Sequence, residues 1–315
     1  MKGVVTVSYS LTNERVEVEA TVKPKKNKWK KTLTYIAFVL PALLFFTLVI
    51  VIPFSQAIVY SFQDWNGISS EIKWVGLQNY MNLFSDAGFI SSLVVTIKFV
   101  LAIVIVTNII GFSLALVLNK ALKSRNILRT FFFLPNVIGS LIIGFIWQFI
   151  FTEVFAQVFE KTGVEIFGIN WLTLPNYAFY ALVLVFSWSF SGYLMIIYLA
   201  ALQGVPKELI ESSYIDGAGP WARLRYVVAP LIMPAITIST FLSASEAFKM
   251  FDMNLSLTNG GPFNTTEMLA LQIYQEAFVN NQYGYGSAQA VAFFVIVAGI
   301  TLAQVAVLKR KEVDF

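Results

Sequence analysis

Residues 89–119 have the sequence FISSLVVTIKFVLAIVIVTNIIGFSLALVLN, in which Lys98 is the single charged side chain. An apolar run of about 20 residues is long enough to cross the hydrocarbon layer of a bilayer, roughly 30 Å thick, as a helix. We therefore expect a membrane-spanning helix here. Lys98 should lie near its outer end, where a long side chain can reach the headgroup region or a neighbouring helix.

Five further runs of similar character occur in the chain of 315 residues. The whole sequence is 57% hydrophobic and 13% charged, with a mean hydropathy of +0.71, whereas soluble domains are typically about 45–50% apolar and about 25% charged. The sequence therefore predicts an all-α fold, an integral membrane bundle of six transmembrane helices. The other five predicted spans are residues 34–62, 129–152, 177–202, 228–250 and 287–308.

Basic residues are distributed unevenly between the loops of this arrangement. Eight precede the first span, four lie between the end of the second span and the first residue of the third, Arg129, included, three lie between the fourth and fifth, and three follow the sixth. The remaining loops contain only Lys73 and Lys161. Because loops rich in Lys and Arg stay in the cytoplasm, the distribution predicts that both termini and the loop between the fourth and fifth spans are cytoplasmic.

Residues 1–32 form a basic cytoplasmic tail ahead of a membrane domain that we assign to residues 33–315. The tail is either a short hairpin over residues 4–22 or disordered, because an isolated two-stranded hairpin is marginally stable in water. Basic residues around Trp29 could also suggest contact with nucleic acid. A basic stretch directly ahead of an apolar run instead favours the anionic inner leaflet, so we expect a lipid membrane partner and no nucleic acid.

The chain contains no cysteine and no histidine. Thiolate nucleophiles, histidine general bases and zinc sites that need either ligand are therefore excluded. No G-x-x-x-x-G-K-[ST] segment occurs that could cradle nucleotide phosphates. The sequence predicts no catalytic residues, no metal site and no bound cofactor, and any ATP hydrolysis that drives this protein must belong to another polypeptide.

The loop over residues 203–230 carries the signals of two short helices. Pro206 and Pro220 each suit the first turn of a helix, and Gly217 and Gly219 suit the bend between them. A helix-turn-helix of this kind could simply be an amphipathic connector on the membrane surface.

The residues of this loop match a known pattern, E-A-A, three residues, G, nine residues and I-x-L-P. The chain has Ser-Ser in place of Ala-Ala, Val227 in place of Ile and Ala229 in place of Leu, at matching spacing. The loop therefore resembles the EAA loop of bacterial ABC importer permeases. The residues that this resemblance assigns to ATPase coupling are Glu211, Ser212, Ser213, Asp216, Gly217 and Ala218.

Three further segments narrow the resemblance to the first permease of a heterodimeric pair in carbohydrate importers of the maltose and multiple-sugar type. They are residues 74–80 (WVGLQNY), residues 252–266 with their Gly-Gly-Pro turn, and residues 285–288 (YGSA). Alone, the Gly-Gly-Pro tripeptide indicates only a turn or loop. Because the segments occur in order and at similar spacing, the resemblance extends over nearly the whole chain beyond the tail.

The resemblance implies a transporter subunit rather than an enzyme, placed in the bacterial cytoplasmic membrane. Its implied partners are a second homologous permease, two ATPase subunits that use ATP and Mg²⁺, and an extracytoplasmic solute-binding protein. The binding protein would dock on the outer loops at residues 63–88 and 251–286. The implied mechanism is alternating access, in which closure of the ATPases moves the coupling loops and turns the solute cavity outward.

Sugars present hydroxyls beside an apolar ring face, so a carbohydrate pocket needs hydrogen-bonding side chains next to aromatic ones. Glu246 and Lys249 are three residues apart on the fifth span, so they form either a structural ion pair or part of the path. Any single aromatic residue could equally serve packing alone. The candidate residues of the solute path are Trp147, Gln148, Trp188, Ser189, Tyr193, Ser243 and Glu246.

Three alternatives compete with a carbohydrate importer. Glycerol phosphate or another polyol is the first, but a phosphate would call for more Lys or Arg side chains along the path than Lys98 and Lys249. An ion-coupled secondary transporter is the second; it would need intramembrane carboxylates or broken helices, and mid-membrane acids are sparse here. A membrane enzyme is the third, and the missing histidine and cysteine disfavour it.

Overall fold

The computed structural model describes residues 28–120 and 122–310, and these divide into two units after Gln56. The hairpin considered for residues 4–22 lies outside the described residues. The predicted all-α membrane fold is confirmed, since helices make up nearly all of the regular structure. The two units are described separately below.

The first unit is one helical run with a π-helical turn in its middle. It consists of α1 (Lys28–Phe46), the π-turn η1 (Thr47–Val51) and the beginning of α2 (Ile52–Tyr60). From Ile36 to Ile52 the run contains only apolar residues, Pro and Thr. Because a helix that is apolar around its whole circumference suits an apolar environment, this run fits the hydrocarbon layer of a membrane.

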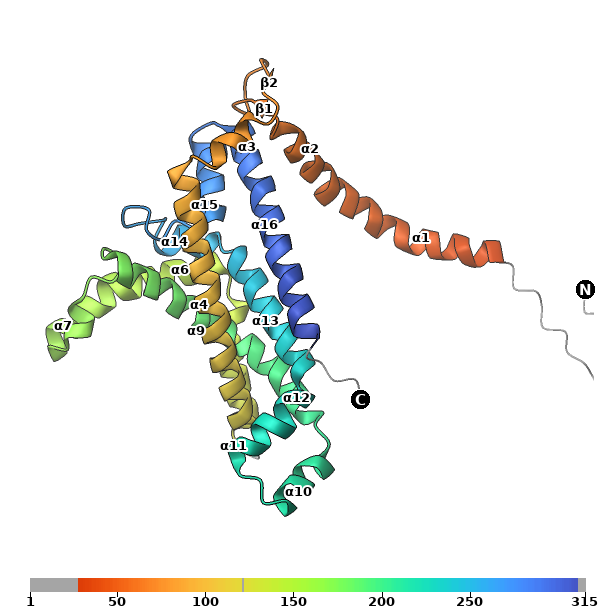
Figure 1. Cartoon of the computed structure of the whole chain (residues 1–315). Coiled ribbons are helices and arrows are strands. Elements are labelled where there is room, and N and C mark those ends of the chain that lie inside the picture. Colours follow the sequence, from red (N-terminus) through yellow and green to blue (C-terminus); the bar gives the residue numbers. More distant parts are fainter. Residues whose placement is uncertain (1–27, 121, 311–315) are drawn as a thin grey trace, which may run out of the picture. The chain divides into compact units, whose positions relative to one another are not determined.

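The second unit, from Ala57 onward, contains the remaining elements (Figure 1). In its first half these are β1 (Gln63–Asp64), β2 (Lys73–Trp74), α3 (Gln78–Leu83), α4 (Ala87–Leu118), α5 (Arg125–Phe133), the 3-10 turn η2 (Leu134–Val137), α6 (Ser140–Phe149), the π-turn η3 (Ile150–Val154), α7 (Phe155–Thr162) and α8 (Glu165–Gly168). In its second half they are α9 (Pro175–Gln203), α10 (Lys207–Ile215), α11 (Pro220–Arg223), the π-turn η4 (Leu224–Val228), α12 (Ala229–Leu231), α13 (Met233–Phe248), α14 (Asp252–Leu257), α15 (Leu269–Tyr274), the π-turn η5 (Gln275–Val279) and α16 (Tyr283–Lys309).

The core of the second unit lies between α4 and α9, which pack along each other, with α13 against α4 and α16 against α13. Phe99 of α4 and Leu182 and Leu194 of α9 are fully buried there. The start of α4 is fixed by Asp86, whose carboxylate accepts hydrogen bonds from the backbone N–H groups of Gly88 (2.8 Å) and Phe89 (3.2 Å). A carboxylate in this position satisfies amides that the first helical turn leaves unpaired.

Five helical runs among the described residues are long and apolar enough to cross a membrane: Tyr35–Tyr60, Ala87–Leu118, Ser140–Thr162, Pro175–Gln203 and Tyr283–Lys309. A sixth candidate is the pair Pro220–Leu231 and Met233–Phe248, whose two halves are bent by 76°. The six predicted spans are therefore accounted for when the bent pair is counted as one.

The prediction of one continuous helix over residues 129–152 is wrong. α5 ends at Phe133, η2 follows, and α6 begins only at Ser140. Pro135 has no amide hydrogen to donate to a preceding turn, and Ile138 is extended, with ψ 135°. The third span instead begins at Ser140 and continues through η3 and α7, beyond the predicted boundary.

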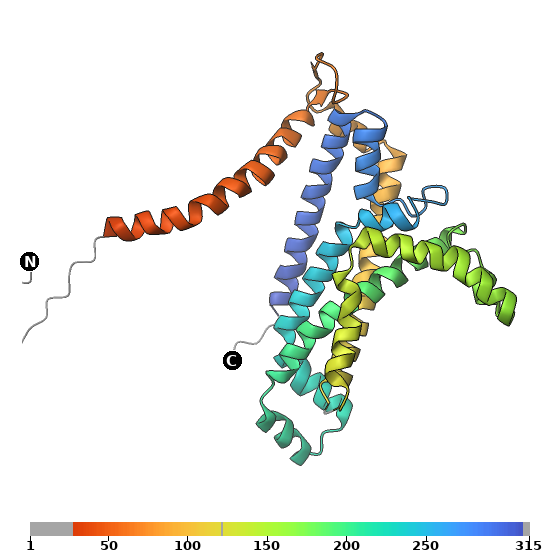
Figure 2. The same ribbon diagram turned by 180° about the vertical axis from the view of Figure 1, so that it is seen from behind.

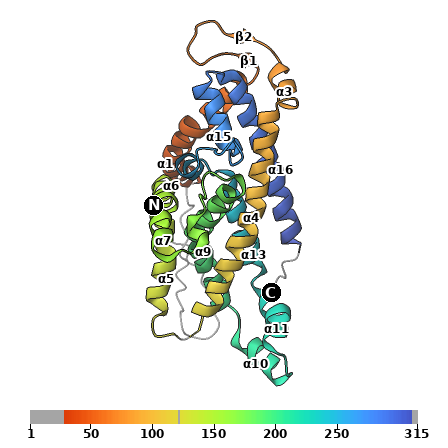
Figure 3. The same cartoon turned by 90° about the vertical axis from the view of Figure 1, so that its left-hand side faces the viewer.

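The two ends of the second unit carry different structures. In three views of the molecule, α10 and α11 lie at one end of the α4–α9–α13 bundle, and α3 with the β1–β2 pair lies at the opposite end (Figures 1, 2 and 3). The two short strands are antiparallel, with Gln63 opposite Trp74. The helix-turn-helix and the family-like outer segment therefore occupy opposite ends of the bundle.

Candidate functional site

The α10–α11 loop ends its first helix in a left-handed turn at Gly217, which has φ +75°. The backbone N–H of Ala218 donates to the carbonyl of Ser213 (2.9 Å), and that of Gly217 donates to the carbonyl of Tyr214 (3.1 Å). This pair of bonds is a Schellman motif, which favours glycine at its left-handed position. The turn thus fixes the direction in which the chain leaves α10 toward Pro220.

Two side-chain contacts hold the loop together. The guanidinium of Arg223 in α11 lies over the Tyr214 ring of α10, 3.7 Å from its centroid. Ser213 is buried, and its hydroxyl donates to the carbonyl of Ile210 (2.6 Å). A small residue is needed at this buried position, which explains why Ser can stand where the family pattern has Ala.

The exposed surface of the α10–α11 loop carries both polar and large apolar side chains. Glu211, Ser212 and Asp216 are exposed, while Ile215 is 86% and Trp221 71% exposed. Large apolar side chains that protrude from a polar loop mark a surface for contact with another protein. Of the six predicted coupling residues, only Ser213 is buried, and Ala218 is half-buried.

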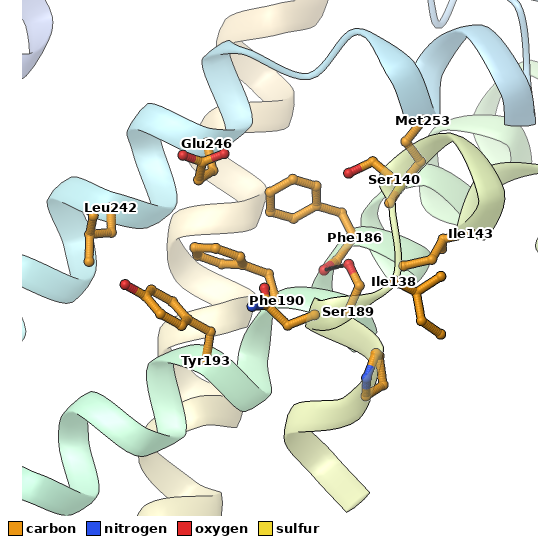
Figure 4. Close-up of a pocket in the computed structure, with 12 residues that line it drawn as sticks. Ile138, Ser140, Ile143, Phe186, Ser189, Phe190, Tyr193, Leu242, Glu246 and Met253 are labelled. Carbon is orange, nitrogen blue, oxygen red and sulfur yellow. Dashed lines mark hydrogen bonds between the residues drawn. The ribbon is translucent and has the colours of Figure 1, made fainter. Parts of the chain in front are cut away.

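A cavity of about 340 Å³ lies between α9, α13 and the broken segment that joins α5 to α6. Figure 4 shows side chains from α9 and α13 around this space, with Ser140 and Ile138 across from them. Three of the predicted path residues, Ser189, Tyr193 and Glu246, line it. The full lining is Pro135, Asn136, Ile138, Ser140, Ile143, Phe186, Ser189, Phe190, Tyr193, Leu242, Glu246 and Met253.

The chemistry of this cavity combines aromatic rings with hydrogen-bonding groups. Phe186, Phe190 and Tyr193 form a run of neighbouring rings along α9, with centroids 5.5 Å apart from one to the next. The Glu246 carboxylate contributes the negative charge and accepts a 2.6 Å hydrogen bond from the Lys249 ammonium. The predicted ion pair therefore exists, and its acidic member also faces the cavity.

The other predicted path residues lie elsewhere. Trp147 and Trp188 contact each other edge to face, with centroids 5.5 Å apart, and Trp188 lines a different cavity. Gln148 is exposed. Ser243 is fully buried between α13 and α4, where its hydroxyl accepts from the Asn108 amide (3.0 Å).

Sequence reasoning missed several residues of the cavity. Asn136 and Ser140 enter it because the chain does not continue as one α-helix between α5 and α6. Pro135 lies at that break, but a proline in a membrane helix can also be tolerated as a kink. Phe186 and Phe190 are in register with Ser189 and Tyr193 on α9, so helical spacing could have found them.

The outer segments that resemble carbohydrate permeases are tied into the fold. The Tyr285 hydroxyl donates to Asp86 (2.7 Å), and the Leu269 backbone N–H donates to the Thr96 hydroxyl (2.9 Å). Asn254 accepts from the backbone N–H of Met268 (3.0 Å). These hydrogen bonds therefore hold together the end of the bundle that carries α3. Within the described ranges, no three His, Cys, Asp or Glu side chains gather into a group that could hold a metal ion.

Comparisons with known proteins agree with this architecture. The family model described as "Binding-protein-dependent transport system inner membrane component" matches residues 107–312. The chain is 46% identical over 291 residues to the probable starch degradation products transport system permease protein AmyD of Thermoanaerobacterium thermosulfurigenes, a match that covers 92% of this chain and 99% of AmyD. It is 30% identical to the multiple sugar-binding transport system permease protein MsmF of Streptococcus mutans, over 93% of this chain and 100% of MsmF.

Among solved structures, the fold is similar to a chain of a bacterial ABC transporter involved in the import of the acidic polysaccharide alginate. The TM-score is 0.77 at 20% sequence identity, and the match covers 90% of this chain and 97% of the other. At this identity the likeness concerns the fold.

Proposed function

Because the chain belongs to the family of binding-protein-dependent transport system inner membrane components, it is a permease subunit and not an enzyme, and we propose that it forms half of the path by which an ATP-driven importer carries a sugar or oligosaccharide. The names of AmyD and MsmF, which describe starch degradation products and multiple sugars, support this class of cargo. The structure of this chain supports a carbohydrate cargo through its cavity, where aromatic rings lie beside hydroxyl and amide groups.

The charge of the cavity supports a neutral cargo. Glu246 lines the cavity, and its cationic partner Lys249, 2.6 Å from the Glu246 carboxylate, is not among the described residues that line it, nor is any other Lys or Arg. A phosphate group would therefore meet a carboxylate and find no cation in the lining to compensate its charge. This favours a sugar over glycerol phosphate for this half of the path.

The proposed mechanism is alternating access driven from the α10–α11 end. The exposed Glu211 and Ile215 fit a surface that docks on an ATPase subunit. Two such ATPases, which bind ATP and Mg²⁺, and a second homologous permease are the proposed partners, together with the solute-binding protein on which the family depends. Closure of the ATPases would shift the loop, and the shift would reach α13 and its cavity residues through α11 and α12.

We place the α10–α11 end in the cytoplasm, with both chain termini on that side. The basic residues support this placement, because Arg223 and Arg225 belong to the loop and Lys309 ends α16. The outer end, with α3 and the β1–β2 pair, would then receive the solute-binding protein.

The test is uptake by the whole transporter, reconstituted in vesicles with ATP inside and the solute-binding protein outside. Tyr193→Phe removes a hydroxyl from the proposed solute cavity. Tyr180→Phe removes a hydroxyl from the separate cavity that Trp188 also lines. We expect Tyr193→Phe to lower kcat/KM for maltodextrin uptake by about two- to tenfold, the effect of one lost hydrogen bond. Tyr180→Phe should leave it unchanged.

Equal uptake by both variants would show that the cavity is not part of the solute path. Faster ATP-driven uptake of glycerol-3-phosphate than of any maltodextrin would replace the carbohydrate assignment. Uptake driven by a proton or sodium gradient, without ATP, would overturn the importer mechanism itself.

A further inference from the structure

A second groove of about 600 Å³ lies near the α10–α11 end and shares no residue with the cavity described above. It is bounded by α4, α9 and α13 of the bundle and by the segment α11–η4–α12, which follows α10. Its lining residues are Asn108, Ile109, Phe112, Ser113, Leu116, Tyr198, Trp221, Leu224, Arg225, Ala229 and Ile236.

Of the polar side chains on the bundle wall of this groove, Asn108 and Tyr198 are already paired with each other, which leaves the exposed Ser113 hydroxyl. The Tyr198 hydroxyl donates to the Asn108 side-chain oxygen (2.6 Å). The Asn108 amide nitrogen donates to the Ser243 hydroxyl (3.0 Å) and to the Val104 carbonyl (2.7 Å). The wall therefore offers a ligand little beyond apolar surface, which suits a hydrocarbon chain.

Arg225 supplies the one charge among the lining residues, and its side chain is exposed. In the part of the chain that the structure describes, the single ion pair is Glu246 with Lys249, so Arg225 has no carboxylate partner there. Its guanidinium carbon lies 5.8 Å from the centroid of the Tyr226 ring. A cation without an anionic partner beside an apolar groove is complementary to an amphiphile with a negative headgroup.

The aromatic residues at this end support the same kind of ligand. Trp221, which lines the groove, and Tyr226 beside Arg225 are both more than two-thirds exposed. Trp and Tyr side chains of this kind are enriched at the level of lipid headgroups, where one part of the ring is apolar and the other wet. A headgroup at Arg225 would therefore allow its acyl chain to lie against Phe112 and Leu116, which line the same groove.

We propose that this groove is a binding site for an anionic phospholipid of the inner leaflet, with the phosphate at Arg225 and an acyl chain along α4. The proposal rests on the cytoplasmic placement of the α10–α11 end proposed above. A lipid seated there contacts the segment α11–η4–α12 and three bundle helices at once. It would therefore stabilise the connection through which movement of the loop reaches the bundle, and transport would depend on anionic lipid.

The test compares two groove variants with two controls in the whole purified transporter. Arg225→Gln removes the charge, and Ser113→Trp fills the groove from an exposed position on α4. Arg125→Gln removes an exposed charge, and Ile105→Trp adds a ring to an exposed site on α4, both outside the groove. Bound phosphatidylglycerol is counted by native mass spectrometry after titration in phosphatidylcholine nanodiscs, and ATP hydrolysis is measured with and without phosphatidylglycerol.

We expect Arg225→Gln to bind phosphatidylglycerol about fivefold more weakly, the effect of losing one basic contact. Ser113→Trp should also bind it more weakly, because its ring occupies the groove, and both variants should lose the stimulation of ATP hydrolysis by phosphatidylglycerol. Arg225→Lys should restore most of the binding, and the two controls should behave like the parent protein. Equal phosphatidylglycerol binding by all variants would overturn the proposal. Loss of the second permease from Arg225→Gln preparations would overturn it too, because the groove would then be a protein interface.

Failure of the lipid site and failure of the proposed function give different results. A transporter that imports maltodextrin equally well with and without phosphatidylglycerol retains its function and has no such site. A preparation that binds phosphatidylglycerol through Arg225 but imports no sugar in any lipid keeps the site and contradicts the function.

Discussion

The guanidinium carbon of Arg223 lies 3.7 Å from the centroid of the Tyr214 ring, and the two residues belong to the two helices of the α10–α11 loop. Helices as short as α10 and α11 are not stable by themselves in water. The contact between these residues and the Schellman turn at Gly217 therefore make one rigid body of the loop. A rigid loop can pass on a movement that a flexible one would absorb.

The first prediction concerns this contact. Tyr214→Leu removes the aromatic ring under Arg223, whereas Tyr214→Phe keeps it. A cation–π contact at an exposed site contributes about 0.5–1 kcal/mol. We expect Tyr214→Leu to lower the amount of sugar transported per ATP hydrolysed by about two- to fivefold, with normal assembly of the complex. Tyr214→Phe should transport normally, and an equal loss in both variants would contradict the role of the contact.

The second prediction compares two glycines in the same loop. Gly217 has φ +75°, whereas Gly219 has φ −67°, and a β-carbon added to either glycine would meet no other atom within 4 Å. The left-handed conformation costs a residue with a β-carbon about 1–2 kcal/mol. Gly217→Ala should therefore reduce ATP-driven uptake, while Gly219→Ala should not. Measured uptake that falls equally in both variants would show that the backbone conformation is not the cause.

The third prediction concerns helix packing. A β-carbon on Gly192 of α9 would overlap the backbone carbonyl of Phe132 at the end of α5, whereas Gly139 has open space around it. Overpacking typically costs about 1–3 kcal/mol. Gly192→Ala should lower the thermal unfolding midpoint of the purified protein in detergent, and Gly139→Ala should not change it. An unchanged midpoint for Gly192→Ala would show that α9 and α5 do not approach so closely.

The fourth prediction is a pH dependence from Glu267, a buried residue in the segment between α14 and α15. Burial raises the pKa of Glu267 above its ordinary value, and the charge of Glu276 raises it further. The folded protein therefore binds this proton more tightly than the unfolded chain does. Stability should fall as pH rises from the ordinary glutamate pKa through the raised one.

Glu267→Gln removes this titration, so it should raise the unfolding midpoint at neutral pH and flatten its decline over that pH range. Glu276→Gln removes only the smaller cause and should give a smaller change in the same direction. The measurement is the thermal midpoint of the purified complex as a function of pH. A midpoint for Glu267→Gln that is lower than that of the parent protein at neutral pH would contradict the prediction.

The spans were predictable from the sequence because length and apolar composition set them. The break between α5 and α6 was not, because residues 129–152 are mostly apolar on both sides of it and their composition gives no boundary. Pro135 lies within that stretch, but a proline in a membrane helix can also be tolerated as a kink. The helix-turn-helix was predictable because Pro206, Pro220 and Gly217 each constrain the local backbone.

The cavity was predictable only in part. Ser189 and Trp188 are neighbours in the sequence, but successive residues of a helix point about 100° apart, and here Ser189 lines this cavity while Trp188 lines another. Which one does so depends on how α9 turns toward α13, which no local pattern specifies. Ser243 was chosen for its hydroxyl, but that hydroxyl pairs with Asn108 on a helix far away in sequence.

The 76° bend between the segment Pro220–Leu231 and α13 has a mechanical consequence. Because of this bend, a force along the axis of the first segment acts on α13 nearly perpendicular to the α13 axis. It acts at Ile232, between the two segments, and this residue is almost fully buried. A force applied sideways to one end of a rod produces torque, so α13 should swing about that pivot more than it slides. Leu242 and Glu246 lie far along that rod, where a small rotation at the pivot gives the largest displacement of the cavity wall.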